Sequence, residues 1–208
     1  MGGGALIGLL APIAFMAFMM AVLAVFLYVC WQLIKKVGAK TTASWSAVAD
    51  RLGLNFSREN ERKDPFILGR LEEVEVEVSL TLKSQRAYRP DRSFIQNKVG
   101  TRVEARLKEE AGYWVMPKVF GSFTAPEGMK ERPVGSGEFA ERYRVFATAD
   151  EGPSEDVCQA IVDSSEPVAI IGDRVVWWCA GIQTDEERLV GAVRGCVAVA
   201  GALGELGS

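Results

Sequence analysis

The sequence predicts an α+β protein in which an N-terminal transmembrane helix is followed by an antiparallel sheet with helices packed on one face. Three observations carry this prediction. Residues 2–34 contain no charged side chain. Residues 74–83 and 99–107 alternate apolar and polar side chains, which is typical of strands with one buried face. Residues 186–203 carry apolar side chains at helical spacing, which is typical of a helix packed on a sheet.

The uncharged N-terminal segment is long enough to cross a bilayer. Residues 5–34 are apolar apart from Gly8, Pro12 and Gln32. A helix of about 20 apolar residues spans the hydrocarbon layer, which is about 30 Å thick. We therefore expect residues 1–36 to form a transmembrane anchor with a short N-terminal tail. Proline is tolerated in the first turn of a helix, so Pro12 is expected near the start of the span.

The residues at the C-terminal end of this segment predict its orientation. Tyr28 and Trp31 stand where amphipathic rings favour the headgroup layer, and Lys35, Lys36 and Lys40 follow at once. Basic residues that flank a span are retained in the cytoplasm. We expect a single-pass protein of the inner (cytoplasmic) membrane, with the N-terminus outside, the C-terminal domain in the cytoplasm and the lipid bilayer as a partner.

Two other interpretations of the segment fit less well. A cleaved signal peptide has a basic N-terminal region and a shorter apolar core, whereas this segment starts with Met1 and glycines. A buried core helix that is apolar all round needs a larger protein around it. The cysteines beyond the span, Cys158, Cys179 and Cys196, form no CxxC pair and fit a reducing compartment better than a disulfide framework.

After the anchor we expect a linker over residues 37–43 and one α+β domain over residues 44–204. Ser44 is a suitable N-cap for a short helix with apolar residues at helical spacing. Gly53 is expected to end that helix in a C-cap.

The next elements are strands. Residues 66–71 predict a short strand, the pair Glu72 and Glu73 predicts a turn, and the alternating residues 74–83 predict the clearest strand of the chain. The glutamates of this strand share a face with serine and threonine. We therefore interpret them as a solvated face rather than as a carboxylate pair for acid–base catalysis. A second alternating strand, 99–107, is expected to pair with it in antiparallel fashion.

The rest of the domain is predicted from shorter signals. Residues 113–119 predict a strand, and Pro117 within it indicates an edge of the sheet. Residues 120–137 are rich in glycine and proline and predict a loop, and residues 139–149 predict a further strand. Ser154 is expected to open a helix.

The C-terminal part is predicted as a hairpin and a helix. A tight turn at Gly172 and Asp173 is expected to join two strands between residues 168 and 179. Thr184 and Glu187 form a capping box for the last helix.

A basic segment lies between the two alternating strands. Residues 84–98 break the alternation and combine basic with aromatic side chains. Such a segment can contact anionic lipid headgroups or single-stranded nucleic acid, or it can be a solvated hairpin loop, which we favour. Nucleic acid is not expected as a partner, because no nucleic-acid fold signature accompanies it. The candidate residues for contact with an anionic surface are Arg86, Tyr88, Arg89, Arg92, Phe94 and Lys98.

The sequence offers no arrangement for a known catalytic chemistry. The chain has no histidine, which removes histidine-dependent triads and HExxH metal sites. It has no GxxxxGK[ST] and no GxGxxG motif. We predict no catalytic residue, no metal ligand and no cofactor.

Three stretches resemble a known group of proteins. They are the tryptophan-containing run 45–56, the residues from Leu68 to Val76, and the segment 139–145, FAERYRV. These stretches resemble uncharacterised bacterial membrane-anchored proteins with a small soluble α+β domain. The resemblance implies a domain on a membrane tether and transfers no catalytic residue.

The preferred function is that of a membrane-tethered non-enzymatic interaction module, or a subunit of a membrane-associated assembly, with a protein partner or self-association. The alternative is a lipid- or small-ligand-binding domain at the membrane surface that uses the segments 86–98 and 120–137. The third interpretation is an enzyme of unknown class.

Overall fold

The computed structural model gives the backbone of residues 3–58, 64–89, 92–120, 125–134, 137–148 and 152–205. Side chains are described for the same residues except 3–14, 82–89, 92–98, 120 and 205. The chain divides into two units, residues 1–40 and residues 41–208, and each unit is described separately.

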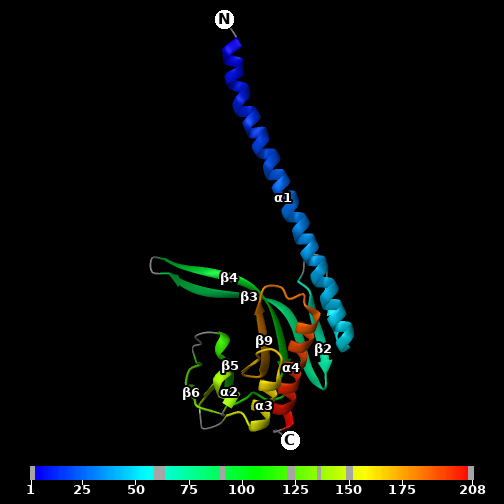
Figure 1. Cartoon of the computed structure of the whole chain (residues 1–208), viewed down its shortest axis with the longest axis vertical. Helices are drawn as coiled ribbons and strands as arrows, with labels where there is room; N and C mark the ends of the chain where they lie inside the picture. Colours follow the sequence, from blue (N-terminus) through cyan, green and yellow to red (C-terminus); the bar gives the residue numbers. More distant parts are fainter. Residues whose placement is uncertain are drawn as a thin grey trace. The chain divides into compact units, whose positions relative to one another are not determined.

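The first helix, α1 (Gly3–Leu52), contributes residues to both units (Figure 1). The predicted linker 37–43 is helical, and so is the predicted cap residue Ser44. The residue in this stretch that weakens a helix most is Gly38, and an internal glycine costs a helix only about 1 kcal/mol. The Ser44 side chain is buried and donates a hydrogen bond to the carbonyl oxygen of Thr184 at 3.0 Å. It therefore serves a tertiary contact and does not begin a helix.

The end of α1 is the predicted glycine cap. Gly53 has a left-handed backbone with φ of 68°, which glycine adopts without strain. The N–H of Leu54 donates to the carbonyl oxygen of Ala49 at 2.9 Å, and the N–H of Gly53 lies 3.4 Å from the carbonyl oxygen of Asp50. This pair of bonds is the Schellman motif, and Leu54 turns back into the core.

One nine-stranded sheet organises residues 41–208, and the predicted α+β class is confirmed. The strand order is β1-β2-β3-β4-β9-β8-β5-β7-β6, and the paired strands are all antiparallel. The strands are β1 (Asn55–Ser57), β2 (Phe66–Leu71), β3 (Val74–Arg89), β4 (Arg92–Arg106), β5 (Tyr113–Pro117), β6 (Lys130–Arg132), β7 (Tyr143–Ala147), β8 (Ala169–Ile171) and β9 (Arg174–Ala180).

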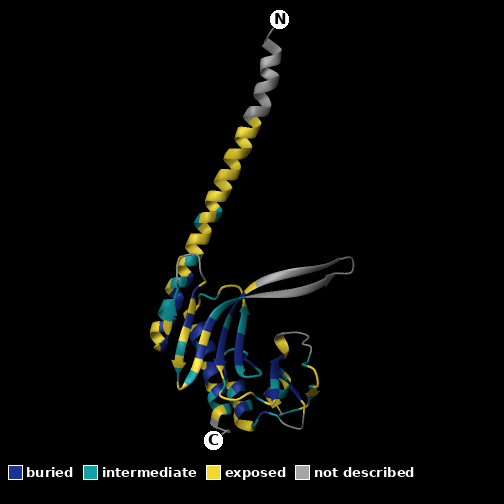
Figure 2. Cartoon of the chain, turned by 180° about the vertical axis from the view of Figure 1, so that it is seen from behind, coloured by how far each residue is buried: buried dark blue, intermediate teal, exposed yellow. Residues whose placement is uncertain are grey.

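Three helices of this unit contribute buried residues to the core on one face of the sheet: α2 (Gly137–Arg142), α3 (Glu155–Asp163) and α4 (Glu186–Glu205). A short 3-10 helix, η1 (Lys118–Phe120), follows β5. Helix α4 packs against β3, β4 and β9, and α3 packs against α4 (Figure 1). The core between helices and sheet contains fully buried residues from both, including Trp45, Ile67, Val103, Trp177 and Leu189 (Figure 2).

A smaller apolar cluster lies on the other face of β5, β7 and β8. Its buried members are Met116, Phe146 and Ala169, and Ala125 and Met129 pack against them. The segment around residues 125–129 therefore covers part of the sheet face that the helices leave free.

The residues that follow α3 approach α4 at two glycines of α4. A Cβ atom added to Gly191 would lie 2.7 Å from the hydroxyl of Ser165, and one added to Gly195 would meet the side chain of Ser164. A larger side chain at either position would collide with the residues that follow α3. Glycine at both positions therefore lets this segment lie close against α4.

The basic segment 84–98 was predicted to be a loop, and this prediction is wrong for the backbone. Strands β3 and β4 stay paired from Glu75 and Arg106 to Arg89 and Arg92. Among the described strand pairs, β2 joins β3 only as far as Val78, and β9 joins β4 only from Thr101. Alternation marks strands with one buried face, so the outer part of this hairpin lacked the signal.

Two shorter predictions are also corrected. Strand β5 lies between β8 and β7, so Pro117 does not mark an edge and instead stands at the last residue of the strand. Phe139 belongs to α2 rather than to a strand, and β7 begins at Tyr143. The predicted turn at Glu72 and Glu73 is confirmed, with φ of 51° and 66°, as a two-residue hairpin loop of the primed type requires.

Candidate functional site

The first candidate site is the apolar surface of α1. From Phe15 to Ile34 every side chain is exposed except the half-buried Cys30 and Gln32 (Figure 2). Twenty helical residues extend about 30 Å, which matches the hydrocarbon layer of a bilayer. In the described part of the chain this is the one helix long and apolar enough to cross a membrane. The exposed large apolar residues here include Phe15, Met16, Phe18, Met20, Val25, Phe26, Leu27 and Ile34.

The polar end of this segment is organised by aromatic rings. The ring centres of Tyr28 and Trp31 lie 6.2 Å apart, and the Lys35 ammonium nitrogen lies 4.0 Å from the centre of the Trp31 ring. Gln32 Nε2 donates a hydrogen bond to the Tyr28 hydroxyl at 3.0 Å, and Lys36 is exposed. The predicted interfacial residues are therefore clustered, with the ammonium group held against an aromatic face.

Pro12 was expected near the first turn of the span. Helix α1 instead begins at Gly3, so the backbone of Pro12 lies inside the helix. Proline in a helix interior removes one backbone hydrogen bond, which transmembrane helices tolerate. The Pro12 side chain lies outside the described residues.

The six candidate residues for an anionic surface lie on the outer part of the β3–β4 hairpin. Their side chains lie outside the described residues, so the structure gives only their backbone register. That register pairs Lys83 with Lys98 and Arg89 with Arg92. The six residues are Arg86, Tyr88 and Arg89 on β3 and Arg92, Phe94 and Lys98 on β4.

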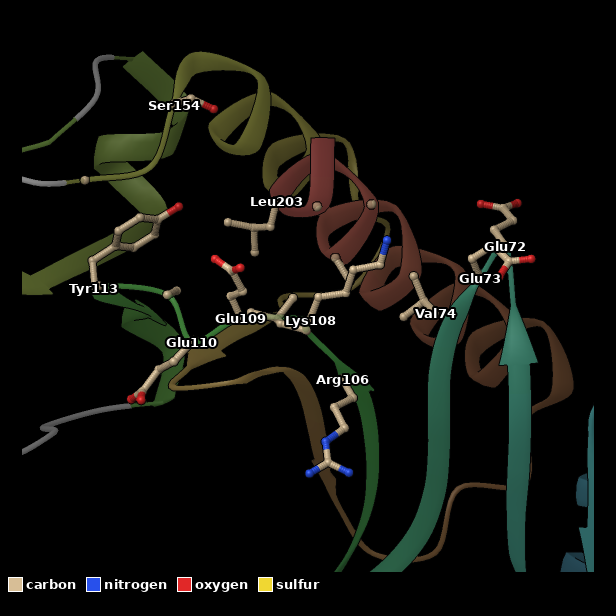
Figure 3. Close-up of a pocket in the computed structure, with 17 residues that line it drawn as sticks. Glu72, Glu73, Val74, Arg106, Lys108, Glu109, Glu110, Tyr113, Ser154 and Leu203 are labelled. Atoms are coloured by element: carbon tan, nitrogen blue, oxygen red, sulfur yellow. The ribbon is translucent and has the colours of Figure 1, made fainter. Parts of the chain in front are cut away.

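A cleft of about 950 Å³ is the second candidate site (Figure 3). It lies between the β2–β3 turn, the connection from β4 to β5, the residues before α3 and the C-terminal end of α4. Small-molecule sites occupy clefts of about 300–1,000 Å³. The cleft is therefore large enough for a ligand of that class.

The lining of the cleft combines an apolar wall with a charged mouth. Acidic side chains outnumber basic ones, so the mouth carries negative charge. The apolar lining residues include Val74, Leu107, Ala111, Tyr113, Ala200 and Leu203. The charged lining residues are Glu72, Glu73, Arg106, Lys108, Glu109 and Glu110.

The β4–β5 connection that carries most of the charges is fastened to the neighbouring hairpin. The N–H of Leu107 donates to the carbonyl oxygen of Asp173 at 2.8 Å, and the N–H of Ala111 donates to that of Gly172 at 3.1 Å. Both acceptors lie in the β8–β9 turn. These bonds fix the backbone of one wall of the cleft.

Helix α4 forms the opposite wall with glycines. A Cβ atom added to Gly201 or to Gly204 would meet no other atom within 4 Å. Both residues line the cleft, and Leu203 stands between them. The missing side chains therefore leave open space beside Leu203 (Figure 3).

Tyr113 is the buried polar residue of the cleft. Its side chain is 8 % exposed, and burial, with a smaller contribution from Cys158, raises the pKa of its hydroxyl to about 12. The hydroxyl faces into the cleft (Figure 3). No other residue of the described part of the chain forms a hydrogen bond with it. At neutral pH it is a protonated group able to donate and accept a hydrogen bond.

A network of charged side chains occupies the sheet face opposite the helices. Glu104 is buried, its Oε2 accepts a hydrogen bond from Arg174 at 2.6 Å, and Arg102 contacts its Oε1. Burial and the nearby Arg174 lower the pKa of Arg102. A shallow hollow of about 80 Å³ adjoins this network and is lined in part by Glu77 and Leu68.

The cysteine thiols of the domain are held in the protonated form. Burial raises the pKa of Cys158 and of Cys179, and it raises that of Cys196 to about 12. A thiolate is the reactive form of cysteine, so these environments lower nucleophilicity at neutral pH. Among the residues with described side chains, no three His, Cys, Asp or Glu residues are grouped as metal ligands.

Sequence reasoning identified the long apolar helix but missed the cleft. The predicted ligand segment 120–137 does not line it, and residues 121–124 and 135–136 lie outside the described part of the chain. The one available signal was the pair of glycines near the end of α4. Gly201 and Gly204 are helical and form a wall.

Comparison with known proteins assigns no family to the chain. No protein-family model, no curated protein and no solved structure matches the chain, so the resemblance to bacterial membrane-anchored proteins remains a prediction from the residues alone.

Proposed function

We propose that the chain is a single-pass inner-membrane protein whose α+β domain is a non-enzymatic interaction module on the cytoplasmic side. The observation that carries the proposal is the exposed, uncharged surface of α1 from Phe15 to Ile34. Soluble monomers rarely expose a contiguous apolar patch larger than a few hundred Å². A bilayer is the surrounding that covers such a helix on all sides.

The proposed orientation follows from charge. Lys35, Lys36 and Lys40 flank the apolar segment on its C-terminal side, whereas the residues before it carry no charged side chain. Retention of basic flanks in the cytoplasm therefore favours a cytoplasmic domain.

The proposed interaction surface is the open face of the sheet. Phe66 and Leu68 are about 40 % exposed there, at 38 % and 41 %, and Leu68 adjoins the hollow beside Glu104 and Arg174. Apolar side chains next to arginines are typical of protein interfaces. The raised thiol pKa values of the domain also fit a binding role better than cysteine catalysis.

Membrane insertion is tested by placing a charge inside the apolar segment. Leu23→Arg should move the chain from the carbonate-resistant membrane fraction toward the soluble or aggregated fraction, because a central arginine costs about 2.5–3.5 kcal/mol of insertion free energy. Ala43→Arg is the matched control, since Ala43 is an exposed residue of α1 beyond the span. Equal membrane retention of both variants would contradict the proposal.

Orientation is tested with a tag after Ser208. The tag should resist protease added to intact spheroplasts and be cleaved after lysis. Replacing Lys35, Lys36 and Lys40 with glutamate should expose a fraction of the tag. Cleavage of the wild-type tag in intact spheroplasts would reverse the proposed topology.

The module itself is tested by partner capture from detergent extracts of cross-linked cells. Leu68→Asp should lose a specific cross-linked band that the wild type forms, while Val119→Asp should retain it. Val119 is 77 % exposed on η1 and serves as a matched surface control. A band pattern that neither variant changes would count against the open sheet face as the interface.

A second candidate function is contact with anionic lipid through the outer β3–β4 hairpin. The register favours it, because Lys83 opposes Lys98 and Arg89 opposes Arg92, and like charges directly opposite destabilise a strand pair. Anionic headgroups would relieve this repulsion. In nanodiscs, hydrogen exchange of residues 82–98 should slow when phosphatidylglycerol replaces phosphatidylcholine. The triple change of Arg86, Arg89 and Arg92 to glutamate should abolish the difference.

A further inference from the structure

We propose that the cleft between the β4–β5 connection and the end of α4 binds a small amphipathic cation, with an apolar body and one amino group. This inference goes beyond the tethered module and does not depend on α1 entering a bilayer. It rests on the size of the cleft, the charge of its mouth and the position of the Tyr113 hydroxyl, which faces into it.

The apolar body fits between Tyr113 and Leu203. These two side chains lie on opposite sides of the open space in Figure 3, and both line the cleft. Gly201 and Gly204 leave that space unfilled, since a Cβ atom at either position would meet nothing within 4 Å. A flat or extended apolar group is the shape that such a slot accepts.

The net negative charge at the mouth of the cleft favours a positively charged ligand. Four glutamates and two basic residues line the cleft, so an anion would meet net repulsion there. The Glu109 carboxylate points toward the space between Tyr113 and Leu203 (Figure 3). An ammonium group at the end of the apolar body would therefore lie beside that carboxylate.

Tyr113 supplies the second, independent observation. Its side chain is 8 % exposed, yet within the described residues its hydroxyl forms no hydrogen bond and faces the cleft. The hydroxyl is not one of the fully enclosed polar atoms that lack a partner among the described residues, so it is open to the cleft and a polar group of a ligand can take the place of water beside it. An ammonium N–H can donate to the hydroxyl oxygen, and the ring face attracts a cation.

The probe for the test is 2-(1-naphthyl)ethylamine, with 1-naphthylacetate as its anionic counterpart. Full-length protein in zwitterionic nanodiscs is titrated with each probe, and empty nanodiscs are subtracted. We expect saturable binding of the amine with Kd of about 1 mM or tighter, as ligand efficiency suggests for a molecule of this size. The acetate should bind at least about tenfold more weakly.

Two variants locate the site. Gly201→Leu should weaken amine binding by at least about tenfold, because its side chain fills the slot. The variant is not expected to unfold the domain, since the added atoms meet open space and leucine favours a helix more than glycine does. Glu109→Gln should weaken amine binding about fivefold, the effect of one exposed ion pair. Glu141→Gln, an exposed acid on α2, is the control.

Three results would overturn the proposal. One is no saturable binding of the amine. Another is binding that Gly201→Leu leaves unchanged while its melting temperature equals that of the wild type. The third is concentration-dependent dimerisation that Gly201→Leu abolishes without any amine binding, because the cleft would then accommodate a second copy of the chain.

Discussion

Replacing Trp45 with alanine tests whether the last turns of α1 belong to the core of the α+β domain. The Trp45 side chain is fully buried, and its Nε1 donates a hydrogen bond to the carbonyl oxygen of Gln183 at 2.8 Å. Truncation of a buried tryptophan to alanine costs about 3–5 kcal/mol. Since domains of this size are stable by about 5–15 kcal/mol, the variant should lose a large part of that free energy.

The assay is urea-dependent pulse proteolysis of the full chain in non-ionic micelles. Trp45→Phe keeps an aromatic ring but leaves the Gln183 carbonyl without its donor, so it should cost about 1–3 kcal/mol. Leu33→Ala is the control, because Leu33 is exposed in the apolar segment of the same helix. A loss below about 1 kcal/mol for Trp45→Ala, or an equal loss for Leu33→Ala, would refute the assignment of residues 41–52 to the domain core.

Three further predictions concern α4. Gly195→Val should lower the free energy of unfolding by about 1–3 kcal/mol, because the added atoms meet Ser164. Gly201→Val should not lower it in this way, because the added atoms meet open space. Thermal melts of the two variants test this difference. Burial raises the pKa of the Cys196 thiol to about 12, so above about pH 9 the unfolded chain releases this proton while the folded chain keeps it. Between about pH 9 and 12 the wild type should therefore lose up to about 1.4 kcal/mol of unfolding free energy per pH unit relative to Cys196→Ala, as measured by urea titration. The Asp185 carboxylate accepts the N–H three residues later at 3.1 Å and caps α4, so Asp185→Ala should cost about 1 kcal/mol in the same titrations.

The sequence predicted helices and strands wherever one face is buried and the other is exposed to solvent. Val76 and Val78 on β3 and Val103 on β4 are fully buried, and their period of two was readable without any partner. The hairpin turn at Gly172, with φ of 61°, was readable for the same local reason. The cap of α4 was placed one residue too early, since Asp185 rather than Thr184 accepts the capping bond.

The features that were missed depend on contacts between distant residues. Helix α1 continues through the predicted linker, and its later residues Ser44 and Trp45 contact the carbonyl oxygens of Thr184 and Gln183, which no local pattern reveals. The cleft joins residues of β3, the β4–β5 connection and α4, and its defining feature is the absence of side chains at Gly201 and Gly204. From sequence alone, glycines near a chain end suggest flexibility, and only their surroundings show that they line a cleft.

The burial of Thr41 and Trp45 also determines how the domain could be shed by a protease. Thr41 is 3 % exposed, and Trp45 is fully buried. Scission between Lys36 and Lys40 would release a body that retains both side chains. Scission after Trp45 would remove the indole and leave carbonyl oxygens of the segment before α4 without their donors. A cut that leaves the domain intact must therefore fall among the few residues between the apolar segment and Thr41.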